Sequence, residues 1–376
     1  MKLTAQVKLL PTQEQIDALK ETLNRVNLAC QFISDVAWET KTFRQYDLHH
    51  KVYYSVREKF SLSAEITVLA IAKVADTYKV SKVKVNFKPA GAIGYDDRIL
   101  SWRLQDKTVS IWTTAGRQRI PFVCGDRQWE LLQTRYGESD FMFFNGMFFL
   151  AAVCNVEEPN KIDIEGVLGV DLGIVNIAVD SDGEVHSAKG VNNIRYRRQS
   201  LRSKLQKKGT RSAKRKLKRL SGKEARYARD LNHKISKHLV VKAKGTNRAI
   251  AMENLEGISE RVTVRRSQRA QLHNWSFYQL RIFVTYKALR LGVPFSVVDP
   301  RNTSRTCPAC GHIDKANRKS QSRFLCVVCG FAGLADHIAA INIGRRADVN
   351  QPIVARGKAN PDKNSVGLSV VASQSL

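Results

Sequence analysis

Four cysteines toward the end of the chain have the spacing of a metal site. Cys307 and Cys310 form one Cys-x-x-Cys pair, Cys326 and Cys329 form a second, and a glycine follows each pair. Four thiolates on two tight turns can hold Zn²⁺ in a tetrahedron. Because four ligands complete that coordination, the sequence predicts a closed, structural zinc site.

Three acidic residues that lie far apart in the sequence are candidates for a second kind of metal site. Asp171 ends an apolar strand, Glu253 ends another, and Asp336 opens a helix. A buried carboxylate is costly unless it is paired, protonated or bound to a metal. Taken singly, Asp171 could face water, and Asp336 could simply be favoured by the dipole of its helix. In a strongly basic chain, the three together predict a site for two Mg²⁺ ions, one activating a water and the other stabilising the leaving oxygen of a phosphodiester.

The charge of the chain indicates a polyanionic partner. Its 376 residues carry a formal charge of +28 with a pI near 10.0, and 43% of them are hydrophobic, as in a globular protein. A membrane surface is the competing polyanion, but no signal-peptide core is present and the longest apolar run, residues 141–153, is too short to span a bilayer. The odd number of cysteines suits a reducing compartment. We therefore expect a cytoplasmic protein, associated with the nucleoid, that binds nucleic acid and no membrane.

A basic segment lies between the first two acids. From Arg195 to Lys223 there are fourteen Lys or Arg residues and no Asp or Glu. Such a run is often a solvated or disordered face. Here leucines interrupt the charge at roughly helical intervals and Gly209-Thr210 forms a break, which favours a basic helical hairpin lying along phosphates without sequence preference. The predicted nucleic-acid contacts are Arg195, Arg197, Arg198, Arg202, Lys204, Lys207, Lys208, Arg211, Lys214, Arg215, Lys216, Lys218 and Arg219.

The first part of the chain is predicted to combine a helical lobe with a strand-rich domain. An opening strand precedes a helix that begins with a capping box at residues 12–15, and a second helical stretch covers residues 63–78. Short strands follow, with Asn145-Gly146 as a two-residue hairpin turn. The simplest arrangement of these strands is a β-barrel or sandwich that includes the opening strand. Its aromatic side chains could stack on bases, although strands that are apolar on both faces are typical of a core.

Three blocks of the second half resemble the split RuvC-like nuclease of TnpB proteins. They are the run from Gly169 to Val179, the segment Met252-Glu253-Asn254-Leu255, and the paired cysteines that lead into the helix from Asp336 to Ile343. TnpB proteins are encoded by bacterial insertion sequences and are related to type V CRISPR effectors. The resemblance covers roughly residues 166–346.

The resemblance implies an RNA-guided DNA endonuclease. In that family a guide RNA from the transposon end is held by the protein and pairs with target double-stranded DNA, while the amino-terminal half reads a short adjacent motif. Asp171, Glu253 and Asp336 would be the catalytic acids that bind Mg²⁺. The four cysteines would hold the zinc that braces the last catalytic helix. We expect one protein per RNA.

The resemblance also implies an α/β multidomain architecture. An RNase H-like (RuvC) nuclease domain with an inserted zinc ribbon would follow a β-barrel wedge domain and a small helical recognition lobe. A helix over residues 275–291 and a strand over residues 295–298 fall within the nuclease domain. The expected boundaries are 1–10 and 81–165 for the wedge domain, 11–80 for the lobe, 166–302 and 333–346 for the nuclease domain, 303–332 for the zinc ribbon and 347–376 for a disordered tail.

One position departs from the family pattern. The residue after His337 is commonly Asn in the family and is Ile338 here. An Asn could orient Asp336, so its loss could weaken metal binding without abolishing it. This departure keeps open an RNA-guided protein that represses without cleavage. A guide-independent nuclease that acts on branched DNA is a third possible function.

Overall fold

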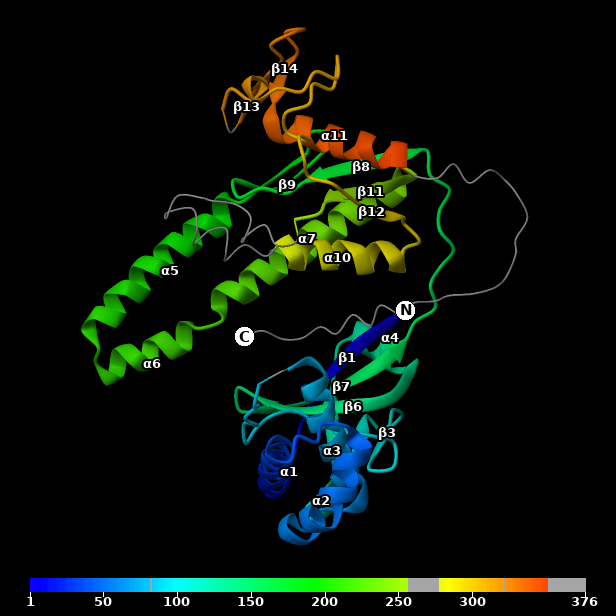
Figure 1. The fold of residues 1–376 in the computed structure, drawn as a ribbon, viewed down its shortest axis with the longest axis vertical. Helices are drawn as coiled ribbons and strands as arrows, with labels where there is room; N and C mark the ends of the chain where they lie inside the picture. Colours follow the sequence, from blue (N-terminus) through cyan, green and yellow to red (C-terminus); the bar gives the residue numbers. More distant parts are fainter. Residues whose placement is uncertain (82, 256–276, 321, 351–376) are drawn as a thin grey trace. The chain divides into compact units, whose positions relative to one another are not determined.

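The fold is described from a computed structural model that covers residues 1–81, 83–255, 277–320 and 322–350. The chain divides into two compact units, one from Met1 to Glu157 and a second that begins at Glu158 (Figure 1). Each unit has its own hydrophobic core. Within the described ranges, no helix is both long enough and apolar enough to cross a lipid bilayer.

Three helices form the helical part of the first unit: α1 (Gln13–Glu39), α2 (Gln45–Phe60) and α3 (Ala64–Val80). The predicted capping box is present at the start of α1. Thr12 Oγ1 accepts the backbone N–H of Gln15 at 3.4 Å, and the Gln15 side chain accepts the backbone N–H of Thr12 at 3.0 Å. The sequence patterns identified α1 and α3, whereas α2 was not predicted as a separate helix.

Seven strands form a strongly curved sheet in the first unit, in the order β2-β6-β7-β1-β5-β4-β3. The predicted turn at Asn145-Gly146 joins β6 to β7, and both residues have positive φ, +52° and +78°. The short helix α4 (Asp126–Leu132) precedes β6. The strands are β1 (Lys2–Leu9), β2 (Ile93–Tyr95), β3 (Leu100–Arg103), β4 (Thr108–Thr113), β5 (Gly116–Val123), β6 (Arg135–Phe144) and β7 (Met147–Asn155).

Side chains link the two ends of this sheet into a near-closed barrel. The Tyr95 hydroxyl on β2 donates to the Trp112 carbonyl on β4 at 2.9 Å, and Trp102 Nε1 on β3 donates to Ser139 Oγ on β6 at 3.3 Å. Phe141 and Phe148 of the β6–β7 hairpin are buried in the barrel, whereas Phe144 is exposed. The same core continues into α1, α2 and α3, so barrel and helices form one folding unit.

The second unit is built on a five-stranded mixed sheet in the order β10-β9-β8-β11-β12. The strands are β8 (Gly166–Asp171), β9 (Asn176–Asp180), β10 (Val185–Ser187), β11 (Arg248–Glu253) and β12 (Phe295–Val298). The first three form an antiparallel meander, and β11 pairs in parallel with both β8 and β12. This mixed topology has the RNase H-like form expected for the nuclease domain.

Helices cover both faces of this sheet (Figure 1). Buried apolar side chains of α7 (Lys223–Gly245) and α10 (Phe277–Arg290) share a core with β8 and β11. Helix α11 (Ala335–Asn350) packs against the other face, where Ile343 joins a separate apolar cluster. Two further helices, α5 (Lys189–Lys208) and α6 (Arg211–Leu220), connect β10 to α7.

Some boundaries differ from the sequence-based ones. Residues 158–165 were assigned to the wedge domain but belong to the second compact unit, where the Ile162 N–H donates to the Gly292 carbonyl at 2.8 Å. Helix α11 continues through Asn350, so a tail that begins at residue 347 is wrong at its start, and residues 351–376 lie outside the described residues. Helix α10 is described from Phe277, which leaves residues 275–276 of the predicted helix outside the description as well.

Gly169 allows β8 and α11 to approach each other at backbone distance. A Cβ atom added at this glycine would lie 2.0 Å from the Ala340 carbonyl oxygen and 2.5 Å from the Gly344 nitrogen. Both are backbone atoms, which cannot rotate aside as a flexible side chain would. The spacing between β8, which carries Asp171, and α11, which carries Asp336, thus depends on a residue without a side chain.

We predict that Gly169→Ala destabilises the protein by about 1–3 kcal/mol or more, because the added methyl forces the strand and helix apart. The measurement is the melting temperature, for which 1 kcal/mol corresponds to about 2–4 °C in a domain of this size. Gly166→Ala in the same strand is the matched control, since its Cβ would meet only Arg248 Cγ, at 4.0 Å. Equal melting temperatures for the two variants would contradict the prediction.

Candidate functional site

The four cysteines converge as predicted. Sγ of Cys307 lies 3.6 Å from Sγ of Cys329, Sγ of Cys310 lies 3.6 Å from Sγ of Cys326, and all four sulfur atoms lie within 4.8 Å of one another. Tetrahedral zinc with Zn–S bonds near 2.3 Å requires sulfur atoms about 3.8 Å apart. The glycine after each pair has φ of +74° or +71°, which completes the tight turn. Four thiol donors in this arrangement fit Zn²⁺.

The cysteine site is packed onto the start of α11. The ribbon consists of two short strands, β13 (Arg323–Leu325) and β14 (Ala332–Leu334), preceded by the 3₁₀ turn η1 (Lys315–Asn317). Phe324 and Ile338 are buried in one small cluster with two of the cysteines. A metal ion held by the cysteines would therefore be coupled to the position of the first turns of α11 through apolar contacts.

The three predicted catalytic acids lie at one edge of the RNase H-like sheet. Asp171 and Glu253 are the last residues of β8 and β11, which are adjacent parallel strands with Val170 opposite Met252. Asp336 is in the first turn of α11, the helix that crosses β8 at Gly169. Since parallel strands end at the same edge of a sheet, the fold brings together carboxylates that are distant in the sequence.

The carboxylates influence one another electrostatically. Burial, together with the negative charges of Glu253 and Asp336, raises the pKa of Asp171 to about 8, and the positive charge of Arg318 and a hydrogen bond from the Leu172 backbone partly oppose this. Burial also raises the pKa of Glu253. The carboxylate oxygens do not all lie within 4.8 Å of one another, in contrast to the four thiols. Carboxylate oxygens are nevertheless the kind of ligand that divalent cations such as Mg²⁺ prefer.

Several residues that orient these acids were not singled out from the sequence. Asn176 Nδ2 at the start of β9 donates to Asp336 Oδ2 at 2.9 Å, and the Thr303 hydroxyl donates to Glu253 Oε1. Asn342 Nδ2 in turn donates to the carbonyl of Thr303 at 2.7 Å. Hydrogen bonds of this kind fix carboxylate ligands in metal sites. The signal that could have identified Asn176 is its polar side chain at the start of an otherwise apolar strand.

Ile338 has a different role from the one considered for this position. Its side chain is 1% exposed and lies in the apolar cluster of the zinc ribbon. Asn176, on a different element, supplies the amide that contacts Asp336. Replacing Ile338 by Asn would place a polar group in an apolar cluster, which costs free energy unless it finds a partner. The effect of Ile338 on metal binding stays a prediction.

The basic segment forms the predicted helical hairpin, and we call residues 189–220 the basic arm. Gly209 has φ of +64° and ends α5, and the Thr210 hydroxyl caps α6 by accepting the Ala213 N–H at 3.3 Å. Arg195 is half-buried and pairs with Glu224 of α7 at 3.2 Å, and Arg198 is also half-buried. The other predicted contacts are exposed, namely Arg197, Arg202, Lys204, Lys207, Lys208, Arg211, Lys214, Arg215, Lys216, Lys218 and Arg219. Their contact with nucleic acid stays a prediction.

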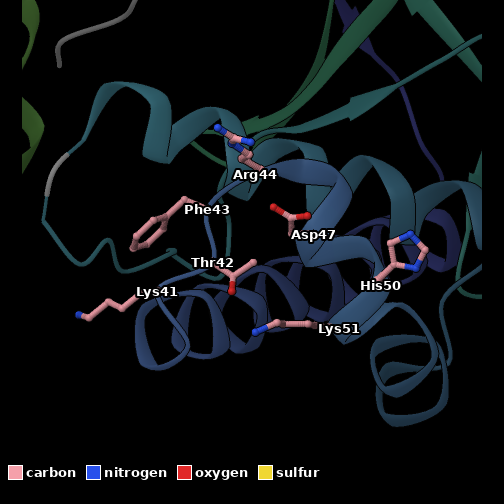
Figure 2. Close-up of a pocket in the computed structure, with 7 residues that line it drawn as sticks. All are labelled: Lys41, Thr42, Phe43, Arg44, Asp47, His50 and Lys51. Atoms are coloured by element: carbon pink, nitrogen blue, oxygen red, sulfur yellow. The ribbon is translucent and has the colours of Figure 1, made fainter.

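The first unit contains an open pocket of about 640 Å³ at the turn from α1 into α2. Figure 2 shows that its side chains come from this single segment. Four of them are cationic or can become so, and one is acidic, so the pocket could accept an anionic group such as a phosphate. The lining residues are Lys41, Thr42, Phe43, Arg44, Asp47, His50 and Lys51.

Comparison with known proteins decides the family. The family model described as "Probable transposase" matches residues 151–256, which include Asp171 and Glu253, and the one described as "Cas12f1-like, TNB domain" matches residues 277–343, which include the cysteines and Asp336. A TnpB-like protein of Methanocaldococcus jannaschii is 30% identical over 201 residues, covering 50% of this chain and 71% of that protein. The chain belongs to the TnpB-like family.

Other relatives of this TnpB-like chain are larger. The CRISPR-associated endodeoxyribonuclease Cas12f1 of Syntrophomonas palmitatica is 29% identical over 226 residues, which are 54% of this chain and 44% of that protein. The chain thus matches less than half of the length of that relative. A cryo-EM structure of a Cas12f1–sgRNA–target DNA complex superposes with a TM-score of 0.61 at 13% identity, covering 89% of this chain and 83% of the other. This likeness confirms the predicted fold class.

Proposed function

We propose that this TnpB-like protein is an RNA-guided DNA endonuclease. It would hold a guide RNA from the transposon end, recognise a short motif beside the target and cleave double-stranded DNA with Mg²⁺. The observation that carries the proposal is the convergence of Asp171, Glu253 and Asp336 at one edge of an RNase H-like sheet. The relative named an endodeoxyribonuclease, and the neighbour solved with guide RNA and target DNA, support the same reading.

The chemistry would be hydrolysis of a phosphodiester. When bound to the three acids, Mg²⁺ ions supply an activated water and stabilise the leaving oxygen. The protein residues hold the ligands in place: Asn176 fixes the carboxylate of Asp336, and Thr303 fixes that of Glu253. The raised pKa of Asp171 supports this assignment, because a divalent cation would relieve the repulsion that keeps its proton bound.

The basic arm would follow the backbone of RNA or of the RNA–DNA heteroduplex. Its exposed Lys and Arg side chains offer positive charge to backbone phosphates, which suits a complex whose sequence information lies in base pairing. The first unit, with its wedge barrel and recognition lobe, would read the adjacent motif, and the cationic pocket at residues 41–51 would contact a phosphate there. One protein per RNA and a location at the nucleoid of a bacterial or archaeal cell complete the proposal.

The test is guided cleavage by the purified full-length chain. RNA that co-purifies from cells carrying the transposon end is sequenced, and a plasmid library is prepared whose target matches that RNA beside randomised sequence. We expect Mg²⁺-dependent linearisation of a subset of plasmids that share a short adjacent motif. Plasmids with a scrambled target should stay intact.

Each alternative gives a different outcome. Protection of the target in footprinting without cleavage in Mg²⁺ or Mn²⁺ would favour an RNA-guided repressor. Cleavage of branched DNA in the absence of RNA would favour a junction nuclease. Absence of co-purified RNA together with sequence-independent cutting would overturn the proposal.

A further inference from the structure

A cluster of two histidines and a glutamate lies outside the acidic site. Glu184 is in the turn that precedes β10, His186 is in β10, and His238 is in α7. One ring nitrogen from each histidine and one carboxylate oxygen lie within 4.8 Å of one another. Nε2 of His238 lies 2.7 Å from Oε1 of Glu184, and the two imidazole rings meet edge to face with centroids 5.3 Å apart. Among the described residues, the four cysteines form the other group of this kind.

The turn that presents Glu184 is fixed by a buried carboxylate. Asp180 is 0% exposed, and its Oδ1 accepts the backbone N–H groups of Asp182 at 3.0 Å and Glu184 at 2.9 Å. Its other oxygen accepts a hydrogen bond from Lys242, which follows His238 by one helical turn. The same buried side chain therefore positions both the turn and the face of α7 that carries His238. The cluster is held in place before any ligand binds.

The charge around the cluster can accept a divalent cation. Lys242 Nζ contacts Asp182 at 3.1 Å and Glu184 Oε2 at 3.2 Å, and Arg248 makes two bonds of 2.7 Å to Asp182. With Asp180, three carboxylates face two cationic side chains, which leaves one net negative charge. The ammonium group of Lys242 repels a bound cation. The affinity for a metal ion must therefore come largely from the neutral imidazole nitrogens.

His186 has unused ligand capacity. Its Nε2 atom is buried and makes no hydrogen bond with any described residue. A buried polar atom without a partner costs free energy. A metal ion bound to the His186 imidazole would reduce that cost, because neutral imidazole is a common metal ligand. Imidazole and carboxylate together prefer zinc and similar transition metals over Mg²⁺.

We propose that Glu184, His186 and His238 form a second zinc site, with three protein ligands and an open position for water. Strand β10 leads directly into α5, and α7 is the helix that returns from the basic arm. Zinc bound here would therefore link β10 to α7, the two segments that flank the basic arm in the sequence. This site differs from the cysteine site in having an open coordination position, and the proposal does not depend on nuclease activity.

The test is the zinc content of the full-length chain after equilibrium dialysis at controlled free Zn²⁺, with excess Mg²⁺ to compete for the carboxylate site. We expect two zinc ions per chain for the wild type and one for His238→Ala, whose side chain is half-exposed in the native fold. Glu184→Gln, which keeps the shape of the side chain, should weaken the second site at least about tenfold. His50→Ala removes an exposed histidine elsewhere and should retain both ions.

Cobalt substitution separates the two sites spectroscopically. Co²⁺ in the cysteine site gives thiolate charge-transfer absorption, whereas Co²⁺ at Glu184, His186 and His238 should add only ligand-field absorption that His238→Ala removes. A single zinc ion in the wild type would overturn the proposal. So would a second ion that persists in both His238→Ala and Glu184→Gln.

Discussion

Asp171→Asn is expected to reduce guided DNA cleavage by about 10³-fold or more while leaving the RNA complex intact. Metal ions in such sites contribute several kcal/mol to transition-state stabilisation, and each 1.36 kcal/mol is a factor of about ten in rate. Asp171 is the central acid of the three, since the charges of both Glu253 and Asp336 act on it. The measurement is single-turnover cleavage of a matched plasmid in Mg²⁺, with RNA binding measured in parallel.

The same substitution is expected to stabilise the metal-free protein at neutral and higher pH. The pKa of Asp171 is raised from 3.8 to about 8 by burial and by its acidic neighbours. An acid with a raised pKa in the folded state favours unfolding once it ionises. Its contribution to stability is therefore unchanged below about pH 4, falls as the pH rises from about 4 to 8, and is constant above that range.

The melting temperature in a chelator at pH 5 and pH 8 measures this effect. The wild type should lose more stability between these values than Asp171→Asn, with about 2–4 °C for each kcal/mol of difference. Added Mg²⁺ should raise the melting temperature of the wild type at pH 8 more than that of the variant. Asp163→Asn, an exposed acid of the same unit, is the control and should behave as the wild type. Identical pH profiles for all three proteins would show that Asp171 is not held in the repulsive environment described above.

Removal of the structural zinc is expected to reduce DNA cleavage strongly, although less than the loss of Asp171. Cys326→Ser should release the zinc of the cysteine site and open the small core around Phe324 and Ile338, because apolar contacts join that core to the metal ligands. Since the core includes the first turns of α11, Asp336 should lose its fixed position. We expect cleavage to fall about 10²-fold, as for loss of residues that orient metal ligands.

Zinc content, cleavage rate and amide hydrogen exchange over residues 335–343 measure this prediction. Exchange should accelerate at the start of α11 in Cys326→Ser and in the wild type treated with a strong chelator. Cys124→Ser changes a half-buried cysteine of the first unit and should keep zinc, exchange and activity. Full activity after verified loss of zinc from the cysteine site would mean that the ribbon does not support the catalytic helix.

Local patterns in the sequence predicted those features that depend on neighbouring residues. The capping box at Thr12, the turn at Asn145-Gly146 and the spacing of the cysteines each specify their own geometry, and each is present in the structure. The acids could be grouped because each ends or begins a buried element. The grouping at one sheet edge also required the parallel pairing of β8 and β11, which no local pattern specifies.

Features that depend on contacts between distant segments were missed. Asn176 meets Asp336, and Thr303 meets Glu253, only because the fold brings separate elements together. The cluster around His186 and His238 was missed for the same reason, since α7 was not identified as a helix beyond the basic run. Polar side chains at such positions do not recur at regular intervals in the sequence, so the hydrophobic pattern cannot identify them.

The connection from β10 to β11 can accept insertions without a change in the catalytic strands. The arm and α7 occupy residues 189–245, yet β8 and β11 pair directly beside each other, with Gly166 opposite Arg248. The entropy of closing a longer connection increases only slowly with its length. Insertions at the tip of the arm, near Gly209, can therefore enlarge the cationic surface while the spacing of the catalytic strands stays the same. The length of the arm and the chemistry of the carboxylates can vary independently in this architecture.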